Sequence, residues 1–140
     1  MRAGGPEAAV DREPMSVHLS IPVQADLVVL ARLTAATVAA RAQFGVEDIE
    51  DLRLAVEELC LSLVHPDDEG RLHFTFDYDA EAITVTCWLE PQPGWESSGR
   101  TDDDDLSLRI LDALVDEHGR EQRQGQTCAW LRKRRARSTV

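Results

Sequence analysis

The chain has 140 residues, of which 26 are acidic and 15 are lysine or arginine, so its net charge is −11. A chain of this length forms one domain around a single hydrophobic core, which excludes a multidomain enzyme. With 43% hydrophobic residues, it is too apolar to be wholly disordered. It contains no apolar run near the roughly 20 residues of a transmembrane helix, and its start lacks the apolar core of a secretory signal. We therefore expect a cytoplasmic protein without membrane attachment.

The charge is unevenly distributed along the chain. Five basic residues gather near the C-terminal end, namely Arg132, Lys133, Arg134, Arg135 and Arg137. Without them, 10 basic residues face 26 acidic ones, a net charge of −16. This acidic remainder of the chain repels phosphates. The charge therefore predicts no direct nucleic-acid binding and favours a basic protein partner. Solubility alone is the alternative reason for the acidity, and the basic end is expected to be solvated.

The first 44 residues predict a tail, a strand and a helix. Residues 1–14 are rich in Gly, Pro, Ala and charge and predict a disordered N-terminal tail. Residues 15–21 alternate between apolar and polar side chains, which is typical of a half-buried strand ended by Pro22. Residues 24–44 favour a helix that Gly45 would cap. Its predicted apolar face consists of Leu27, Leu30, Ala31, Thr34, Val38 and Ala42.

A second helix is predicted over residues 47–64, because acidic side chains open the segment and apolar ones recur at helical spacing. The predicted core stripe is Ile49, Leu52, Val56, Leu59 and Leu63. Arg53 and Glu57 lie four residues apart, so we expect them to pair on the outer surface of this helix.

The second half predicts two hairpins and a third helix. Residues 71–78 and 83–89 alternate and form the first hairpin, and residues 90–105 are a long loop, functional or disordered. The third helix is expected to start at an Asp105 cap and to end at Gly119. Its apolar positions are Leu108, Leu111, Ala113, Leu114 and Val115. A turn at Gln124 and Gly125 separates a strand over 126–132 from a short partner within 118–123.

This order of elements predicts an α+β fold, a two-layer sandwich with helices on one face of a mixed, mostly antiparallel sheet. The domain would span residues 15–134, and residues 135–140 would form a basic C-terminal tail.

The cysteines and histidines predict no metal site. Three cysteines without CxxC spacing lie in apolar segments, so we expect core side chains in a reducing compartment: Cys60, Cys87 and Cys128. The four histidines have no carboxylate or cysteine at metal-ligand spacing and are expected at the surface or at strand edges: His18, His65, His73 and His118. Trp88 and Trp95, beside the long loop, are either partner anchors or core side chains.

Residues 51–60 read DLRLAVEELC, and this segment resembles the signature helix of the RsbW-type anti-sigma factors. These are bacterial members of the GHKL ATPase superfamily, whose N-box has the pattern Asp-x-Arg-Leu-Ala-Val-x-Glu-x-x-x-Asn. The helix of residues 30–42 and the helix of residues 106–117 are similar to the family's first and last helices. The resemblance covers residues 17–134 and implies the histidine-kinase-like ATPase (Bergerat) fold.

The resemblance implies roles for two residues of this helix. In the family, the N-box Glu assists an attacking hydroxyl and the Asn holds the magnesium that bridges the ATP phosphates. Glu58 matches the Glu, and Ser62 falls on the Asn position in a chain that contains no asparagine. A serine hydroxyl does ligate Mg²⁺ in other enzymes, but its side chain is shorter. The competing interpretations are a solvated or vestigial carboxylate at Glu58 and a helix-surface serine at Ser62.

The two glycine-rich nucleotide boxes of the family are degenerate here. The stretch matching the first box, residues 89–96, keeps one glycine, Gly94, and contains two prolines. The second box retains Gly99 and is followed by four aspartates, residues 102–105, at a helix start where the family binds phosphate. Each close aspartate would oppose a triphosphate by about 1–4 kcal/mol. The interpretation is a retained scaffold with a lost ATP site, no cofactor and no metal.

The leading hypothesis is an anti-sigma factor that sequesters an alternative sigma factor and is released by a STAS-type anti-anti-sigma protein. The alternative is an active serine/threonine protein kinase that phosphorylates this anti-anti-sigma partner with Mg-ATP, using Glu58 and Ser62. A third hypothesis is another small ligand in the remodelled cleft. A homodimer is possible through pairing of the edge strand at residues 17–21.

Overall fold

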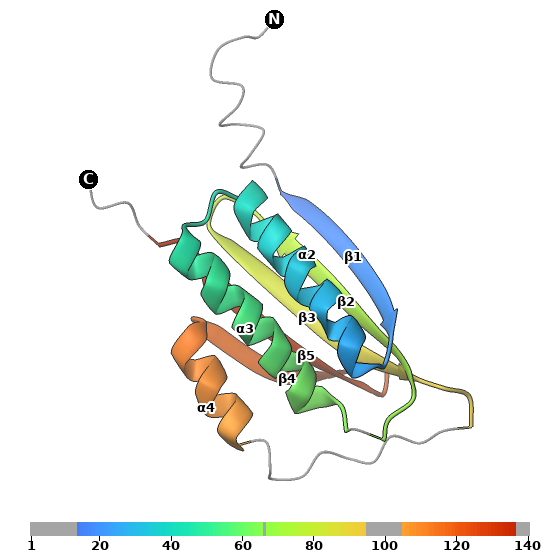
Figure 1. The fold of residues 1–140 in the computed structure, drawn as a ribbon. Coiled ribbons are helices and arrows are strands. Elements are labelled where there is room, and N and C mark those ends of the chain that lie inside the picture. Colours follow the sequence, from blue (N-terminus) through green and yellow to red (C-terminus); the bar gives the residue numbers. More distant parts are fainter. Residues whose placement is uncertain (1–13, 66, 95–104, 137–140) are drawn as a thin grey trace, which may run out of the picture.

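The computed structural model describes residues 14–65, 67–94 and 105–136. Within these ranges the chain forms three α-helices, a short 3₁₀ helix and five strands (Figure 1). In chain order they are β1 (Met15–Pro22), η1 (Ala25–Leu27), α2 (Val28–Arg41), α3 (Val46–Leu63), β2 (Gly70–Tyr78), β3 (Ala82–Pro91), α4 (Asp105–Leu114), β4 (Glu117–Arg123) and β5 (Gln126–Arg134). Trp95, Gly99, the aspartates at 102–104 and most residues of the two predicted tails lie outside the described ranges.

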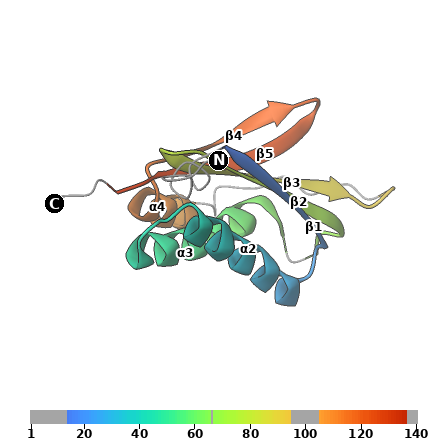
Figure 2. The ribbon, with the colours of Figure 1, turned by 90° about the horizontal axis from the view of Figure 1, so that it is seen from above.

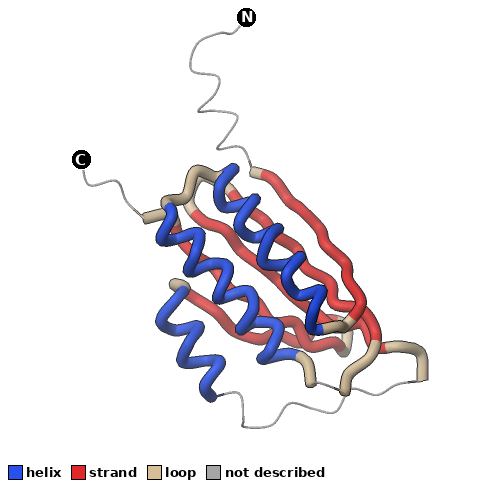
Figure 3. Tube along the Cα trace, viewed as in Figure 1, coloured by secondary structure: helices blue, strands red, loops and turns tan. Residues whose placement is uncertain are grey.

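The five strands form one sheet in the order β1-β2-β3-β5-β4, and every pairing between these strands is antiparallel. The three helices lie side by side on the same face of this sheet (Figures 2 and 3). No described helix covers the opposite face, which we call the open face. The predicted α+β two-layer sandwich is therefore confirmed, with a sheet that is antiparallel throughout the described strands.

The core lies between the helices and the sheet. Alternate residues of β2 and β3 point at the helices and are buried, as the period of two in the sequence predicts: Leu72, Phe74, Phe76, Tyr78, Ile83, Val85, Cys87 and Leu89. On α3 the predicted stripe is confirmed, because Leu52, Val56, Leu59 and Leu63 are buried and Ile49 packs against them. The predicted Arg53–Glu57 pair was wrong. Arg53 bonds Glu50 at 2.9 Å, and Glu57 turns to Arg32 of α2.

The predicted face of α2 is confirmed at Ala31, Val38 and Ala42 but is wrong at Leu30. Leu30 is 40% exposed, whereas Ala31, Ala35 and Ala39 are fully buried. Small side chains at four-residue spacing allow α2 to lie close to the sheet and to α3, which outweighs the larger apolar area of a leucine at this interface. Hydrophobicity alone ranks Leu above Ala, so the sequence pattern could not reveal this preference.

Two predicted helix ends at glycine were also wrong. The left-handed residue after α2 is Gln43 (φ 65°), and Gly45 (φ −71°) is instead the N-cap of α3. Gly119 lies within β4, where the indole of Trp130 on β5 covers it; an added Cβ would meet the ring at 3.1 Å. The predicted turn at Gln124 and Gly125 is confirmed, because both residues have positive φ, as a two-residue type I′ hairpin requires.

Candidate functional site

A cavity of about 300 Å³ opens between α3, α4 and the β4–β5 hairpin. Two residues from each helix, three from β4 and one from β5 line it: Leu59, Ser62, Leu108, Leu111, His118, Gly119, Arg120 and Ala129. Its volume is at the lower limit of ligand pockets, which run from about 300 to 1,000 Å³. The cavity therefore contains the N-box position of α3 in a largely apolar wall.

Ser62 is buried, with 1% of its surface exposed, which corrects the interpretation of a helix-surface serine. Its Oγ donates a hydrogen bond to the Leu59 carbonyl at 2.8 Å, within the last turn of α3. The side of α3 that carries Ser62 faces α4 and β4, elements distant in sequence, so the period of the helix could not show that it is covered. The proton of the Ser62 hydroxyl is therefore used in a hydrogen bond within α3.

Two polar residues of the edge strand β4 line the cavity: Arg120, which the sequence analysis did not single out, and His118, which it expected at the surface or at a strand edge. The guanidinium of Arg120 donates to the backbone carbonyl of Ser62 at the end of α3. His118 Nε2 lies 2.6 Å from Asp112 Oδ1 of α4. Both residues point to the helices from alternate positions of β4. The only sequence signal for these two residues was the alternation of side chains along β4. This strand is too polar to resemble a core strand, so the signal was weak.

The predicted site residues are only partly brought together. Glu58 is half-buried on α3, one turn before Ser62, and does not line the cavity. Gly94 lies in the turn after β3 with φ +82°, also away from the cavity lining, and Gly99 lies outside the described residues. Of the three predicted positions that the structure describes, only Ser62 lines this cavity.

The described cavity residues do not fit a magnesium-nucleotide complex. Magnesium selects carboxylate, carbonyl and phosphate oxygens, and this wall offers one hydroxyl that is already bonded to a helix carbonyl. The imidazole of His118 and the guanidinium of Arg120 are already held by Asp112 and by the Ser62 carbonyl. In the part of the chain that the structure describes, no group of three His, Cys, Asp or Glu side chains is arranged to hold a metal ion.

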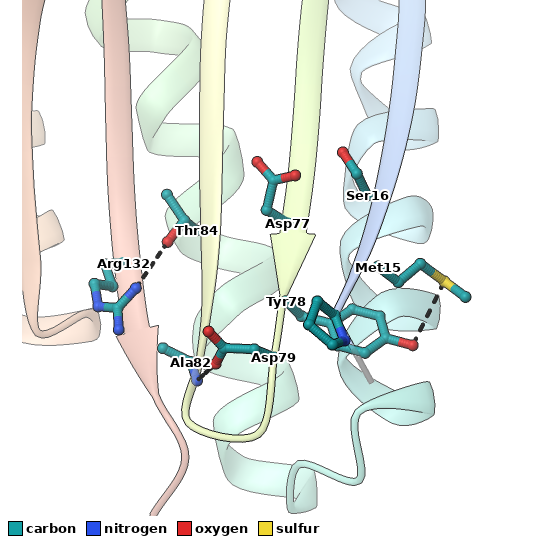
Figure 4. A pocket seen from close by; sticks show the side chains of 9 residues that line it. Met15, Ser16, Asp77, Tyr78, Asp79, Ala82, Thr84 and Arg132 are labelled. Atoms are coloured by element: carbon teal, nitrogen blue, oxygen red, sulfur yellow. Dashed lines mark hydrogen bonds between the residues drawn. The ribbon is translucent and has the colours of Figure 1, made fainter. Parts of the chain in front are cut away.

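A second cavity, also of about 300 Å³, lies on the open face at one end of β1, β2 and β3 (Figure 4). A row of polar residues crosses four strands here in register, Ser16, Asp77, Thr84 and Arg132. Arg132 donates to Thr84 Oγ1 at 3.2 Å. This hydrogen bond joins β5 to β3 on the open face beside the cavity.

Asp79 closes the β2–β3 hairpin beside this second cavity. Its Oδ1 accepts the backbone N–H groups of Glu81 at 2.8 Å and Ala82 at 3.1 Å. The Glu81 N–H lowers the pKa of Asp79; partial burial opposes this shift, and the Ala82 N–H and the Arg132 charge add to it. Hydrogen bonds to the ionised carboxylate stabilise it, which explains why the pKa is lowered.

Cys60 and Cys87 serve as core side chains, as predicted. Cys128 is also a buried free thiol, but it is in register with Trp88 on the open face and lies outside the core cluster. Burial, and then the hydrogen bond with Cys60, raises the pKa of the Cys87 thiol well above its usual value. Burial also raises the pKa of Cys128. Since the thiolate is the nucleophile, none of these groups supports covalent catalysis.

Trp88 lies on the open face and not in the core between the layers. Its ring stacks on His73 with centroids 5.2 Å apart, and His73 Nε2 lies 2.7 Å from Glu90 Oε1. The side chains of Trp88 and His73 are half-buried. The tryptophan therefore forms part of the sheet's outer surface.

No helix in the described ranges is both long and apolar enough to cross a membrane.

Comparison with known proteins assigns the family. A family model described as the histidine kinase-like ATPase domain matches residues 21–133. The serine-protein kinase RsbW of Bacillus cereus (strain AH187) is 36% identical over 72 residues, which cover 49% of this chain and 45% of the relative. The serine-protein kinase RsbW of Bacillus thuringiensis (strain Al Hakam) is 36% identical over 63 residues, which cover 43% and 39%. This chain thus matches less than half the length of these curated relatives. Together with the fold, the match to residues 21–133 shows that the chain belongs to the histidine kinase-like ATPase domain family.

Proposed function

We propose that the chain is a cytoplasmic anti-sigma factor that binds and sequesters an alternative sigma factor without using a nucleotide. The observation that carries this proposal is the state of the N-box position. Ser62 replaces the family's asparagine, is buried, and bonds to its own helix, while Arg120 occupies the carbonyl at the same helix end. A site built in this way has the scaffold of an ATPase and lacks a ligand for the phosphate-bound metal.

The distribution of charge supports a basic protein partner. Helix α3 alone carries six carboxylates and one arginine. Regions of a sigma factor that face promoter DNA are basic, and complementary charge accelerates encounter. The same acidity disfavours direct binding of this chain to nucleic acid. Release would follow competition by a STAS-type anti-anti-sigma protein.

Binding is tested by mixing the purified chain with each alternative sigma factor encoded in the same genome, followed by pull-down at moderate salt. We expect one sigma factor to be retained and to be released when the cognate anti-anti-sigma protein is added. Retention of none of them would overturn the proposal. A Glu58→Gln variant is the matched control, because sequestration by surface contact does not need a base at this position.

The second candidate is an active serine kinase that phosphorylates the anti-anti-sigma partner. The relatives reported above are named serine-protein kinases, and Glu58 retains the N-box carboxylate. This function requires ATP and Mg²⁺ to bind. Titration calorimetry at millimolar nucleotide separates the two candidates: heat of binding with Mg²⁺, followed by phosphate transfer that Glu58→Gln abolishes, supports the kinase. We expect neither.

A homodimer is a further proposal, because β1 is an edge strand of the sheet. Size-exclusion chromatography with light scattering distinguishes a mass near 15.6 kDa from twice that value.

A further inference from the structure

Of the six large apolar side chains exposed on α2 and α3, four lie opposite the buried faces of these helices, on the surface that faces away from the sheet. Val29 is 37% exposed, Leu33 53%, Leu54 51% and Leu61 49%. A single exposed leucine is normal on a protein surface, whereas a group of such residues on one surface indicates an interaction site. We call these four residues the α2–α3 patch.

An ion pair joins the two helices between the α2 half and the α3 half of the patch. Arg32 Nη1 of α2 lies 3.3 Å from Glu57 Oε1 of α3, which brings these two turns together. Val29 and Leu33 are on the turns of α2 next to Arg32, and Leu54 and Leu61 lie three residues before and four residues after Glu57. Residues three and four apart share a helix face. The two helices run side by side in both views (Figures 1 and 2), so the apolar side chains lie on either side of this pair.

The border of the patch on α3 is acidic. Glu47 and Glu50 lie seven and four residues before Leu54 along the helix, spacings that place them on the same face as this leucine. Both side chains are exposed. The surface complementary to such a border has an apolar centre and positively charged flanks.

We propose that the α2–α3 patch is the surface on which this chain binds an amphipathic helix with basic flanks, presented by the sigma factor that it sequesters. This inference rests on the proposed function and adds the location and the chemistry of the contact. An amphipathic helix inserts apolar residues at i, i+3, i+4 and i+7, which fits a patch formed by two adjacent helices. The apolar anchors supply affinity, and the carboxylates select a basic partner over an acidic one.

The test measures the affinity of the full chain for the sigma factor identified by pull-down. The variant Leu33→Ser/Leu54→Ser is expected to weaken binding by about tenfold or more, as loss of central apolar anchors does. The matched control is Leu106→Ser on α4, where the leucine is 66% exposed and outside the patch, and its affinity should equal that of the unmodified chain. Circular dichroism and the melting temperature establish that each variant is folded.

A second variant examines the charge. Glu47→Gln/Glu50→Gln should weaken binding at low salt and reduce its dependence on ionic strength, because two border carboxylates are lost. If a sigma factor binds and both double variants retain full affinity, the patch is not the contact, while the proposed function stands. If no sigma factor binds the unmodified chain, the proposed function fails and this inference fails with it.

Discussion

The ammonium of Lys133 on β5 lies 3.6 Å from a carboxylate oxygen of Asp48 in the first turn of α3. It also donates to the Leu114 carbonyl at the end of α4, at 2.9 Å, and lies 3.8 Å from Asp51. Lys133 is the only lysine of the chain and is 8% exposed. A cation at the C-terminal end of one helix and carboxylates at the N-terminal end of another both interact favourably with the helix dipoles. The lysine thus joins three elements, and the expectation of a solvated basic end does not hold for it.

Replacing this lysine tests the junction. Lys133→Met keeps the aliphatic stem but leaves Asp48 and the Leu114 carbonyl without the ammonium, so we expect a loss of about 1–3 kcal/mol in the free energy of unfolding. Urea denaturation measures it. Arg134→Met is the control, because Arg134 is an exposed residue whose pair with Glu117 spans 3.7 Å, and such pairs contribute at most about 1 kcal/mol. Equal losses in the free energy of unfolding for the two variants would refute the role of Lys133 in joining β5, α3 and α4.

The pKa of Asp79 predicts a dependence of stability on acid pH. Because folding lowers this pKa, the carboxylate contributes stability above the pKa of the unfolded chain, and this contribution is lost as the pH falls through the folded value. Asp79→Ala should therefore lower the melting temperature at neutral pH and have a smaller effect at the acid end. Thermal melts from neutral pH to pH 3 measure the difference. A difference that is constant with pH would contradict this assignment.

Gly70 requires a residue without a side chain. Its φ is +133°, and an added Cβ would clash with the Glu90 carbonyl oxygen and lie 2.9 Å from the Gln92 nitrogen. Gly70→Ala should cost more than about 2 kcal/mol, since backbone atoms cannot move aside cheaply. Gly125→Ala is the matched comparison: it has φ +78° with open space around it, so only about 1–2 kcal/mol of left-handed strain is expected. Chemical denaturation should rank the two variants in this order.

Enlarging Ser62 probes both stability and function. Ser62→Asn restores the residue type of the family motif at a buried position, and overpacking should cost about 1–3 kcal/mol. Because the glycine-rich boxes stay degenerate, calorimetry with Mg-ATP should still detect no binding. Tight nucleotide binding by this variant would mean that Ser62 alone separates the chain from active kinases.

The thiols should be inert in the folded protein. Cys60, Cys87 and Cys128 are buried, and the pKa values of Cys87 and Cys128 are raised. A thiol reagent at neutral pH should label none of them within minutes, and all three should react in denaturant. Fast labelling of one thiol under native conditions would indicate local opening of the strand or helix that carries it, which peptide mapping would identify.

Much of the fold could be predicted from periodicity. The period of two in β2 and β3 and the stripe of α3 were both correct, because each pattern is strong over several turns or residues. On α2 the prediction failed at Leu30 and missed Ala35 and Ala39, because an alanine-rich helix has several apolar faces of similar strength. Gly119 resembled a helix end, but the indole of Trp130 accounts for it.

The candidate site was less predictable than the fold. The motif of residues 51–60 identified the family, and the position of Ser62 followed from it. That Ser62 is buried, that Arg120 binds its carbonyl and that Lys133 joins α3 to α4 depend on residues brought together from distant segments. The spacing of apolar side chains in a helix or strand follows from local backbone geometry. The sequence by itself therefore determined the elements and the family. The tertiary structure alone decided which polar groups meet, because burial and partners are set by how the elements pack.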